Sequence, residues 1–433
     1  MNPTLLGVIG IVVLIILIFT RMPVAYVMTL VGFVGFAVQV NGHAALKLLA
    51  RDFYSVYSSY GLTIIPLFIF MGQIAFNAGI SRRLYDSAYK FVGCYRGGLA
   101  TATVCACTAF GAVCGSSPAT AATMATVGLP EMKRYGYGDE LASGSVAAGG
   151  GLGMLMPPSV VLIVYGILTE QSIGKLFVAG ILPAVFITIC FALAVWVYCR
   201  LAPKQGPACD AFSWGERLRS LGETGETMLV FLLVMGGLFA GAFTPTEAGA
   251  VGAAAVLLVA LIRRQLTWAG FVKSIYETLR TSCMVLLLVA GAVIFGHFLA
   301  VTRITFDVAN WVAELNLPGY AVVAMIVLVY LIGGCFIDAL ALIMLTIPIF
   351  YPIIMDLGYD PVWFGIIIVL VTQMGVITPP VGINVYVVNG IAKDIPLEKI
   401  FRGVVPFLIA LIIGTGFIVI FPQIALWLPN LMY

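Results

Sequence analysis

Charged side chains are scarce in this sequence. Asp, Glu, Lys and Arg account for 9% of the 433 residues, whereas 62% of the residues are hydrophobic. A soluble globular domain carries about 25% charged residues, so this composition excludes one and predicts a multi-pass helical membrane protein surrounded by the lipid bilayer. The sequence also lacks a long hydrophilic domain and a phosphate-binding P-loop. An ATP-driven pump is therefore not expected, nor is a nucleic-acid partner.

Histidine is nearly absent, and the cysteines are not paired. The only histidines are His43 and His297, and none of the nine cysteines forms a CxxC motif. A membrane-embedded enzyme usually needs clustered acidic or histidine ligands at one membrane face, so an enzyme is not expected. We interpret the cysteines as small buried hydrophobic residues, because most of them lie in apolar segments.

Apolar segments long enough to cross a bilayer occur throughout the chain. They fall at 4–20, 23–40, 61–79, 140–172, 177–199, 226–244, 246–263, 281–300, 362–392 and 402–428. Two further segments, 97–131 and 319–352, are apolar at both ends and broken in the middle, which predicts re-entrant hairpins. With the N-terminus outside, this topology places eighteen of the 22 lysines and arginines on the inner side, in agreement with the positive-inside rule.

Two stretches of the chain, about 220 residues apart, carry the same pattern. Gly151–Pro158 (GLGMLMPP) interrupts one apolar segment with paired prolines, and Gly375–Pro380 (GVITPP) interrupts another. Each follows one of the broken hairpins, and the predicted topology runs the two copies in opposite directions. The sequence therefore predicts an all-α membrane fold with an inverted-topology repeat of two re-entrant hairpins and two proline-broken helices. Interrupted segments in such repeats indicate the central site of a secondary transporter.

The first hairpin breaks at Gly115–Pro118, which contains two serines, and Thr120 follows. Unpaired backbone groups are costly in hydrocarbon, so such a turn persists only if it is buried or binds a ligand. Pro157-Pro158 lacks the amide hydrogens that would pair carbonyls near Met156. Hydroxyl and carbonyl oxygens suit Na⁺, which predicts a sodium site between the two breaks. The alternative is a proline kink whose hydroxyls bond back to carbonyls four residues earlier.

The second hairpin breaks at Gly333–Asp338 and adds an ionisable group. A carboxylate at membrane depth is a functional candidate, so Asp338 is expected to take part in ion coupling. Thr378 and Asn384 lie in the proline-broken segment that follows. The alternative is that Asp338 only caps the start of a helix.

Four helix halves are predicted to begin at membrane depth, after Pro118, Pro158, Asp338 and Pro380. Helix N-termini carry partial positive charge and unpaired amides, which suit a carboxylate. The core segments contain almost no lysine or arginine. An organic anion would therefore be held by helix ends, backbone amides and bound sodium.

Four motifs resemble those of one transporter family. The segments GSSPATAA (followed by GLPEM), GGGLGMLMPPS, FTPTEAGAVGA and GVITPPVGINVYV are similar to the large membrane subunit (M subunit) of tripartite ATP-independent periplasmic (TRAP) transporters, the DctM-like family. The resemblance covers nearly the whole chain. It implies an elevator-type fold of the ion transporter superfamily and sodium-coupled uptake of a small organic anion across the bacterial inner membrane. It also implies two partners, a periplasmic substrate-binding protein and a small four-helix membrane subunit.

The resemblance further implies a division of the chain and a set of site residues. Residues 1–96 and 173–318 would form scaffold and arm helices, 97–172 and 319–392 the two repeats of a transport domain, and 393–433 a C-terminal scaffold or arm helix. One sodium site would involve Gly115, Ser116, Ser117, Met156 and Pro157, and a second Gly334, Asp338, Thr378 and Pro379. The substrate is expected beside Ser117, Pro118, Thr120, Pro158, Pro380 and Asn384.

Several alternatives stay open. A self-sufficient organic anion symporter of the same superfamily, coupled to sodium or protons, would share the paired breaks. The family includes carriers of C4-dicarboxylates, sialic acid and 2-oxo acids, and the motifs do not select among them. The chain shows no leading region of four spans, so we expect the small subunit to be a separate polypeptide.

Overall fold

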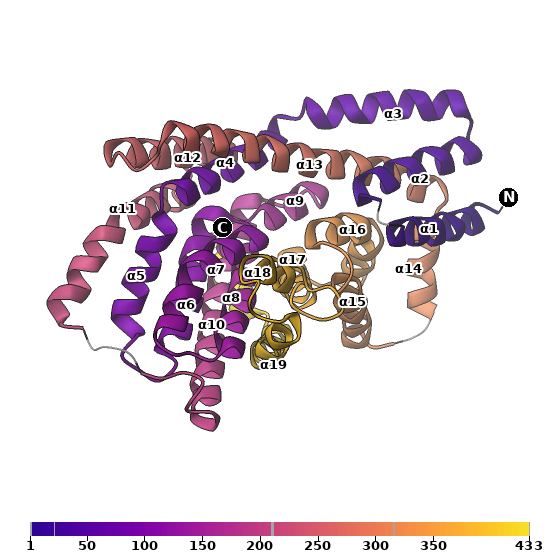
Figure 1. Ribbon diagram of the computed structural model, residues 1–433. Coiled ribbons are helices and arrows are strands. Elements are labelled where there is room, and N and C mark those ends of the chain that lie inside the picture. Colours follow the sequence, from indigo (N-terminus) through magenta and orange to yellow (C-terminus); the bar gives the residue numbers. More distant parts are fainter. Residues whose placement is uncertain (1, 21, 209–211, 315–316, 433) are drawn as a thin grey trace.

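The computed structural model describes residues 2–20, 22–208, 212–314 and 317–432, and every regular element in these ranges is a helix (Figure 1). Within them, six helices are long and apolar enough to cross a membrane. They are Tyr60–Asn77, which joins a 3₁₀ turn to α4 (Ile64–Asn77), and α10 (Ile173–Leu201), α12 (Pro245–Ile262), α13 (Trp268–Val301), α16 (Ala339–Asp356) and α19 (Leu397–Ile420). The bent helix α11 (Trp214–Phe239) would make a seventh. The multi-pass helical class is therefore confirmed.

Three helices lie where the pattern of long apolar runs predicts none. They are α3 (Gly42–Tyr57), α5 (Ile80–Val92) and α14 (Ile304–Glu314). Each mixes polar with apolar residues, so a search for continuous apolar segments does not find them. Helix α3 packs on α13 through a polar pair, in which Oδ2 of the buried Asp52 lies 2.8 Å from Nδ1 of the partly exposed His297.

Both predicted hairpins are present as pairs of helices joined by a tight turn. Helices α6 (Gly98–Cys114) and α7 (Ser117–Arg134) flank residues 115–116, which we call the first hairpin turn. Gly115 has a φ of +63°, a left-handed conformation that favours glycine. Helices α15 (Gly319–Gly334) and α16 flank residues 335–338, the second hairpin turn. Whether these hairpins re-enter the membrane on one side stays a prediction.

Both proline-broken helices are present too. Helix α8 (Asp139–Gly151) and a short 3₁₀ turn (Leu152–Met154) end at residues 155–159, the first proline break, and α9 (Val160–Leu168) follows. Helix α17 (Pro361–Gly375) ends at residues 376–382, the second proline break, and α18 (Ile383–Ile391) follows. Each break separates two helices because a proline nitrogen cannot donate the hydrogen bond that would continue the helix.

The two repeats pair their breaks in the same way. The Val160 amide donates to Gly115 O at 3.4 Å, and the Val381 amide donates to Cys335 O at 3.3 Å. A Cβ atom added to Gly111 would lie 2.7 Å from Gly153 Cα, and one added to Gly334 would lie 3.1 Å from Gly375 Cα. These pairs are related by offsets of 220 to 223 residues. Each hairpin therefore packs its turn against its own broken helix, which confirms the internal repeat.

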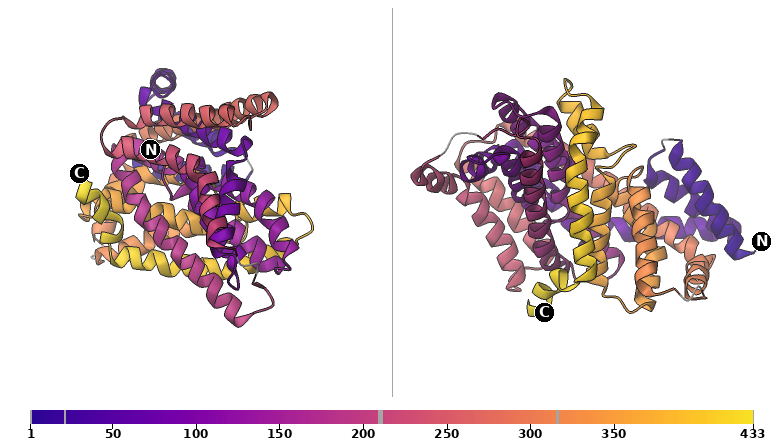
Figure 2. Two further views of the ribbon diagram at one scale, coloured as in Figure 1. Left: turned by 90° about the vertical axis from the view of Figure 1, so that its left-hand side faces the viewer. Right: turned by 90° about the horizontal axis from the view of Figure 1, so that it is seen from below.

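The helices form layers around these breaks. In Figure 1, α12, α4 and α13 make a row along the top with α3 outside it, and the hairpins and broken helices lie beneath that row. The right-hand view of Figure 2 shows α19 between the purple helices of the first repeat and the orange helices of the second. The division into transport domain and scaffold stays a prediction, and this layering is compatible with it.

Helix α19 approaches the first repeat at a pair of glycines. A Cβ atom added to Gly144 of α8 would lie 2.1 Å from Gly403 O, and one added to Gly403 would lie 1.9 Å from Glu140 O. Lys399 Nζ also bonds Asp139 Oδ2 at 3.0 Å beside this crossing. Because the opposing atoms are backbone, neither helix can yield to a side chain without moving away from the other.

We expect Gly403→Ala to destabilise the protein, because the added methyl group forces α8 and α19 apart. Overpacking of this kind costs about 1–3 kcal/mol. The matched control is Gly416→Ala in the same helix, where an added Cβ meets nothing within 4 Å and the gain in helix propensity is up to about 1 kcal/mol. Thermal unfolding in detergent should therefore shift in opposite directions for the two variants. Equal midpoints would show that the close crossing is not structurally important.

Candidate functional site

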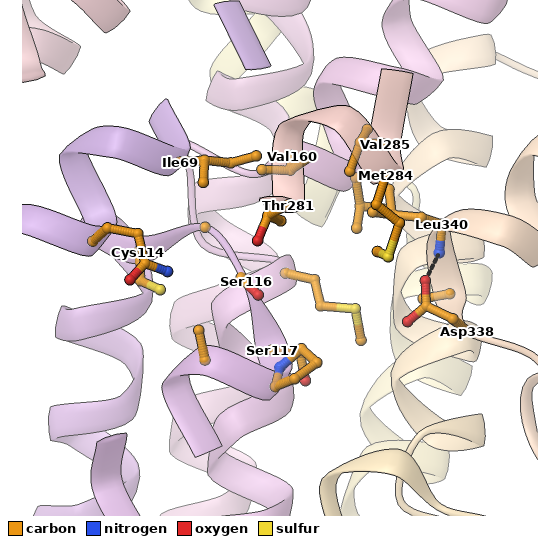
Figure 3. Close-up of a pocket in the computed structure, with 17 residues that line it drawn as sticks. Ile69, Cys114, Ser116, Ser117, Val160, Thr281, Met284, Val285, Asp338 and Leu340 are labelled. Carbon is orange, nitrogen blue, oxygen red and sulfur yellow. Dashed lines mark hydrogen bonds between the residues drawn. The ribbon is translucent and has the colours of Figure 1, made fainter. Parts of the chain in front are cut away.

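A cavity of about 290 Å³ lies where both repeats meet two long helices of the upper row (Figure 3). Its walls come from the first hairpin turn, the start of α9, the start of α16, and the middle of α4 and α13. The residues that line it are Ile69, Gln73, Cys114, Gly115, Ser116, Ser117, Pro118, Ala119, Met154, Val160, Val161, Thr281, Met284, Val285, Asp338, Ala339 and Leu340. The cavity thus combines segments that lie more than 250 residues apart in the sequence.

The start of α7 presents open backbone amides to this cavity. Ser116 occupies the N-cap position, but its side chain makes no capping hydrogen bond to the helix. Pro118 lies in the first turn and has no amide hydrogen, so Ser117 and Ala119 hold the first-turn amides nearest the cavity. An uncapped helix start of this kind attracts an anion through its amides and its dipole.

Two other helices begin at the same cavity. Helix α9 starts with Val160 and Val161, and α16 starts with Ala339 and Leu340. Among the described residues that line the cavity, none is lysine, arginine or histidine. Three helix N-termini therefore meet at the cavity, as the sequence predicts for three of its four helix halves. Of these, α9 is capped by Ser159 and α16 by Asp338, whereas α7 is left without a side-chain cap. The fourth, α18, does not contribute to the lining.

Asp338 faces the cavity and caps a helix at the same time. Its Oδ2 accepts a hydrogen bond from the Leu340 amide at 3.1 Å, and the side chain is half-buried (Figure 3). Capping therefore satisfies one carboxylate oxygen of Asp338. Because Asp338 lies at the cavity wall, its other oxygen is available to a cation. The two interpretations of Asp338 are compatible.

Ser117 is held from behind by the second repeat. Its Oγ lies 2.8 Å from Asn384 Nδ2, and the same amide nitrogen donates to Ala147 O at 3.0 Å. Ser117 is 2% exposed and Asn384 is fully buried. Asn384 belongs to α18, so this contact joins the second broken helix to the first hairpin.

Two of the predicted hydroxyl ligands bond to backbone carbonyls close by in the chain. Thr120 Oγ1 donates to Ser116 O at 2.8 Å, and Thr378 Oγ1 donates to Met374 O at 2.7 Å. Each acceptor lies four residues earlier, which is the arrangement of the proline-kink alternative. The oxygen of each hydroxyl keeps lone pairs, but its proton is committed to the backbone.

The predicted site residues are only partly brought together. Gly115, Ser116, Ser117, Pro118 and Asp338 line the cavity. The others do not line it: Thr120, Met156, Pro157, Pro158, Gly334, Thr378, Pro379, Pro380 and Asn384. Met156 instead lines a separate, mostly apolar cavity between α6, α10 and α11. Gly334 and Gly375 are in backbone contact behind the second hairpin turn.

Helices α4 and α13 contribute cavity residues that the sequence does not predict. Gln73 and Thr281 are the polar ones, and the Thr281 hydroxyl points into the cavity in Figure 3. Hydrogen bonds brace these helices nearby, since Ser274 Oγ lies 3.2 Å from Gln73 O and 2.9 Å from Asn77 Nδ2. A glutamine within the apolar run of α4 was the only available signal.

Comparisons with known proteins agree with this architecture. The family model described as "Tripartite ATP-independent periplasmic transporter, DctM component" matches residues 11–424. The C4-dicarboxylate TRAP transporter large permease protein DctM of Pseudomonas aeruginosa is 37% identical over 387 residues, which covers 89% of this chain and 90% of that protein. The sialic acid TRAP transporter large permease protein SiaM of Vibrio cholerae is 33% identical and covers 96% of each chain. Other relatives are named for ectoine and isethionate.

The fold has also been seen in a solved structure. The crystal structure of the Alcanivorax borkumensis YdaH transporter superposes with a TM-score of 0.64, covering 99% of this chain and 98% of that one, at 14% sequence identity. At this identity the likeness concerns the fold alone. The family match and the large-permease relatives cover nearly the whole sequence and confirm the resemblance drawn from its motifs. The chain therefore belongs to the DctM component family of tripartite ATP-independent periplasmic transporters, as a multi-pass membrane permease subunit.

Proposed function

We propose that this permease subunit carries a small organic carboxylate into the cell together with sodium ions. The observation that supports the proposal best is the cavity, at which three helix N-termini meet beside Asp338 without a basic side chain. Helix ends and amides suit a carboxylate, whereas the aspartate and the nearby carbonyls suit a cation. A site with both characters fits co-transport of an anion and Na⁺.

The proposed sodium ions occupy the two hairpin turns. The first is held by Gly115, Ser116 and Ser117 with carbonyls near Met156 and Pro157, because the first proline break lies against this turn. The second is held by the Gly334–Asp338 segment with Thr378 and Pro379. The available donors are hydroxyl, carbonyl and carboxylate oxygens, which are the ligands that hard cations prefer.

The proposed substrate binds between the first hairpin turn and α16. Ser117 and Pro118 line the cavity. Thr120, Pro158, Pro380 and Asn384 lie outside its lining, and we propose that they approach the substrate only when the repeats shift. Known relatives are named for C4-dicarboxylate, sialic acid, ectoine and isethionate. The lining favours a small carboxylate such as a C4-dicarboxylate, a sialic acid or a 2-oxo acid, and does not choose one among them.

The proposed movement is an elevator, in which segments 97–172 and 319–392 slide against the remaining helices. Supporting this, the cavity has one wall from the hairpins and another from α4 and α13, so a sliding motion would open and close it. We propose that the chain lies in the bacterial inner membrane with its N-terminus in the periplasm. Its proposed partners are a separate small four-helix subunit and a periplasmic substrate-binding protein.

The decisive experiment is uptake of radiolabelled organic acids into proteoliposomes. These contain the chain with its small subunit, and they are assayed with and without binding protein and an inward sodium gradient. Uptake that needs both the gradient and the binding protein is expected. Uptake that needs neither partner would instead establish a self-sufficient symporter, and uptake indifferent to sodium would refute the coupling.

We expect Asp338→Asn to raise the sodium concentration for half-maximal uptake at least tenfold. Asparagine caps a helix about as well as aspartate, so α16 should stay intact while the charge is lost. A tenfold change corresponds to about 1.4 kcal/mol. The matched control is Asp360→Asn, because Asp360 caps α17 through the amides of Val362 and Trp363 and does not line the cavity. An unchanged sodium midpoint for Asp338→Asn would exclude Asp338 from the ion site.

Thr281→Val should weaken substrate binding without affecting the sodium sites. The substitution keeps the shape of the side chain and removes the hydroxyl that points into the cavity. Losing one hydrogen bond of about 0.5–1.5 kcal/mol should raise KM roughly twofold to tenfold. Thr278→Val is the control on the same helix, since its hydroxyl bonds Ser274 O at 2.6 Å and it does not line the cavity. Equal KM values for both variants would place the substrate elsewhere.

A further inference from the structure

We propose that Asn384 is a positioning residue that couples the two sodium sites, so that they fill cooperatively. This inference rests on the proposed sodium-coupled function and extends it to a residue that does not line the cavity. Asn384 acts through two partners, the Ser117 hydroxyl in the first repeat and the backbone of the second proline break.

The side chain of Asn384 orients the hydroxyl at the first site. Its Nδ2 has two hydrogens, which bond Ser117 Oγ at 2.8 Å and Ala147 O at 3.0 Å. The Ser117 hydroxyl also donates to Asn384 Oδ1 at 3.0 Å. The Ser117 oxygen therefore accepts one bond and donates one on the Asn384 side, and it keeps a second lone pair for a cation. Both side chains are at least 98% buried, so water does not compete for these bonds. Without the amide, the hydroxyl would be free to rotate away.

The backbone of the same residue closes the second site. The Asn384 amide donates to Val376 O at 3.1 Å, across the second proline break. The Val381 amide of that break bonds Cys335 O in the second hairpin turn at 3.3 Å. A sodium ion that orders Thr378 and Pro379 would therefore fix Asn384 as well, and through it Ser117. The two sites share one rigid residue, and such sharing makes the second binding event cost less ordering entropy.

The repeat shows that asparagine is not needed to build the fold at this position. Matching Val160 with Val381 makes Ile163 the counterpart of Asn384, and matching the paired prolines makes it Leu162, which is also fully buried. Ile163 is fully buried in α9. An apolar side chain therefore occupies the corresponding position of the first broken helix, where the Ile163 amide bonds Ser159 O and does not reach across the break. The side-chain amide of Asn384 serves the contact between the repeats.

The chain supplies a matched control on the same helix. Asn389 is also in α18, and its Nδ2 donates to Ile395 O at 2.9 Å. This bond stays within the connection that follows α18 and does not reach the first repeat. Asn389→Leu and Asn384→Leu remove the same amide from the same helix, but only the second breaks the link to Ser117.

The test is the sodium dependence of uptake by the complete transporter in proteoliposomes. For Asn384→Leu we expect a Hill coefficient that falls towards 1 and a sodium midpoint raised about tenfold. For Asn389→Leu we expect the wild-type values of both. Ser117→Ala combined with Asn384→Leu should shift the midpoint no further than the more severe single variant, because both substitutions break one interaction.

A second measurement covers the case in which Asn384→Leu folds poorly. Asn384→Ser keeps a polar group but is too short to reach Ser117 and Ala147 together, and its sodium-dependent rise in melting temperature can be titrated in detergent. A less steep titration than wild type is expected. If uptake by the wild-type transporter does not depend on sodium, the proposed function is refuted. If it does depend on sodium, but the sodium titrations of both Asn384 variants are as steep as that of the wild type, only the coupling is refuted.

Discussion

The structure depends on how a helix can stop within an apolar, closely packed interior. Every break leaves amides and carbonyls that hydrocarbon cannot satisfy, and each such group costs several kcal/mol. This chain meets the cost by placing two breaks side by side in each repeat. Gly115 O accepts from the Val160 amide, and Cys335 O accepts from the Val381 amide. Each hairpin turn is therefore joined to its own proline break by a backbone hydrogen bond, which satisfies one carbonyl and one amide that the breaks leave open.

The contact between each hairpin turn and its proline break leaves some polar groups without a partner in the backbone, and these groups face the cavity. At the first hairpin turn, the Gly115 carbonyl accepts a hydrogen bond from the Val160 amide. The amides at the start of α7 are not capped by Ser116. At the second turn the balance is different, because Asp338 caps α16 with its own carboxylate. One turn therefore offers positive potential and the other a negative charge. They face the same cavity, and this arrangement is the basis of the proposal that one site binds an anion and a cation together.

The sequence was most informative where local chemistry decides the structure. Paired prolines, Gly115 and the acidic residue at 338 predicted all four breaks, because each acts on its own stretch of backbone. It was least informative about side chains whose partners are distant. Gln73 and Thr281 reach the cavity only through the packing of α4 and α13 on the hairpins. The hydroxyls of Thr120 and Thr378 bond to backbone carbonyls close by in the chain, a choice that composition and spacing do not determine.

The differences between the repeats carry more functional information than their likeness. A shared backbone plan explains the close glycine contacts, which recur between Gly111 and Gly153 and between Gly334 and Gly375. It does not explain why a buried asparagine stands in α18 where the first repeat has a buried isoleucine or leucine. A buried amide is costly unless it is fully hydrogen-bonded, so its retention needs a partner that the first repeat lacks. That partner is Ser117 in the opposite repeat. It adds a fully buried polar link to the hydrogen bonds that Tyr165 and Gln171 of the first repeat make with Pro361 O and the Tyr351 hydroxyl of the second.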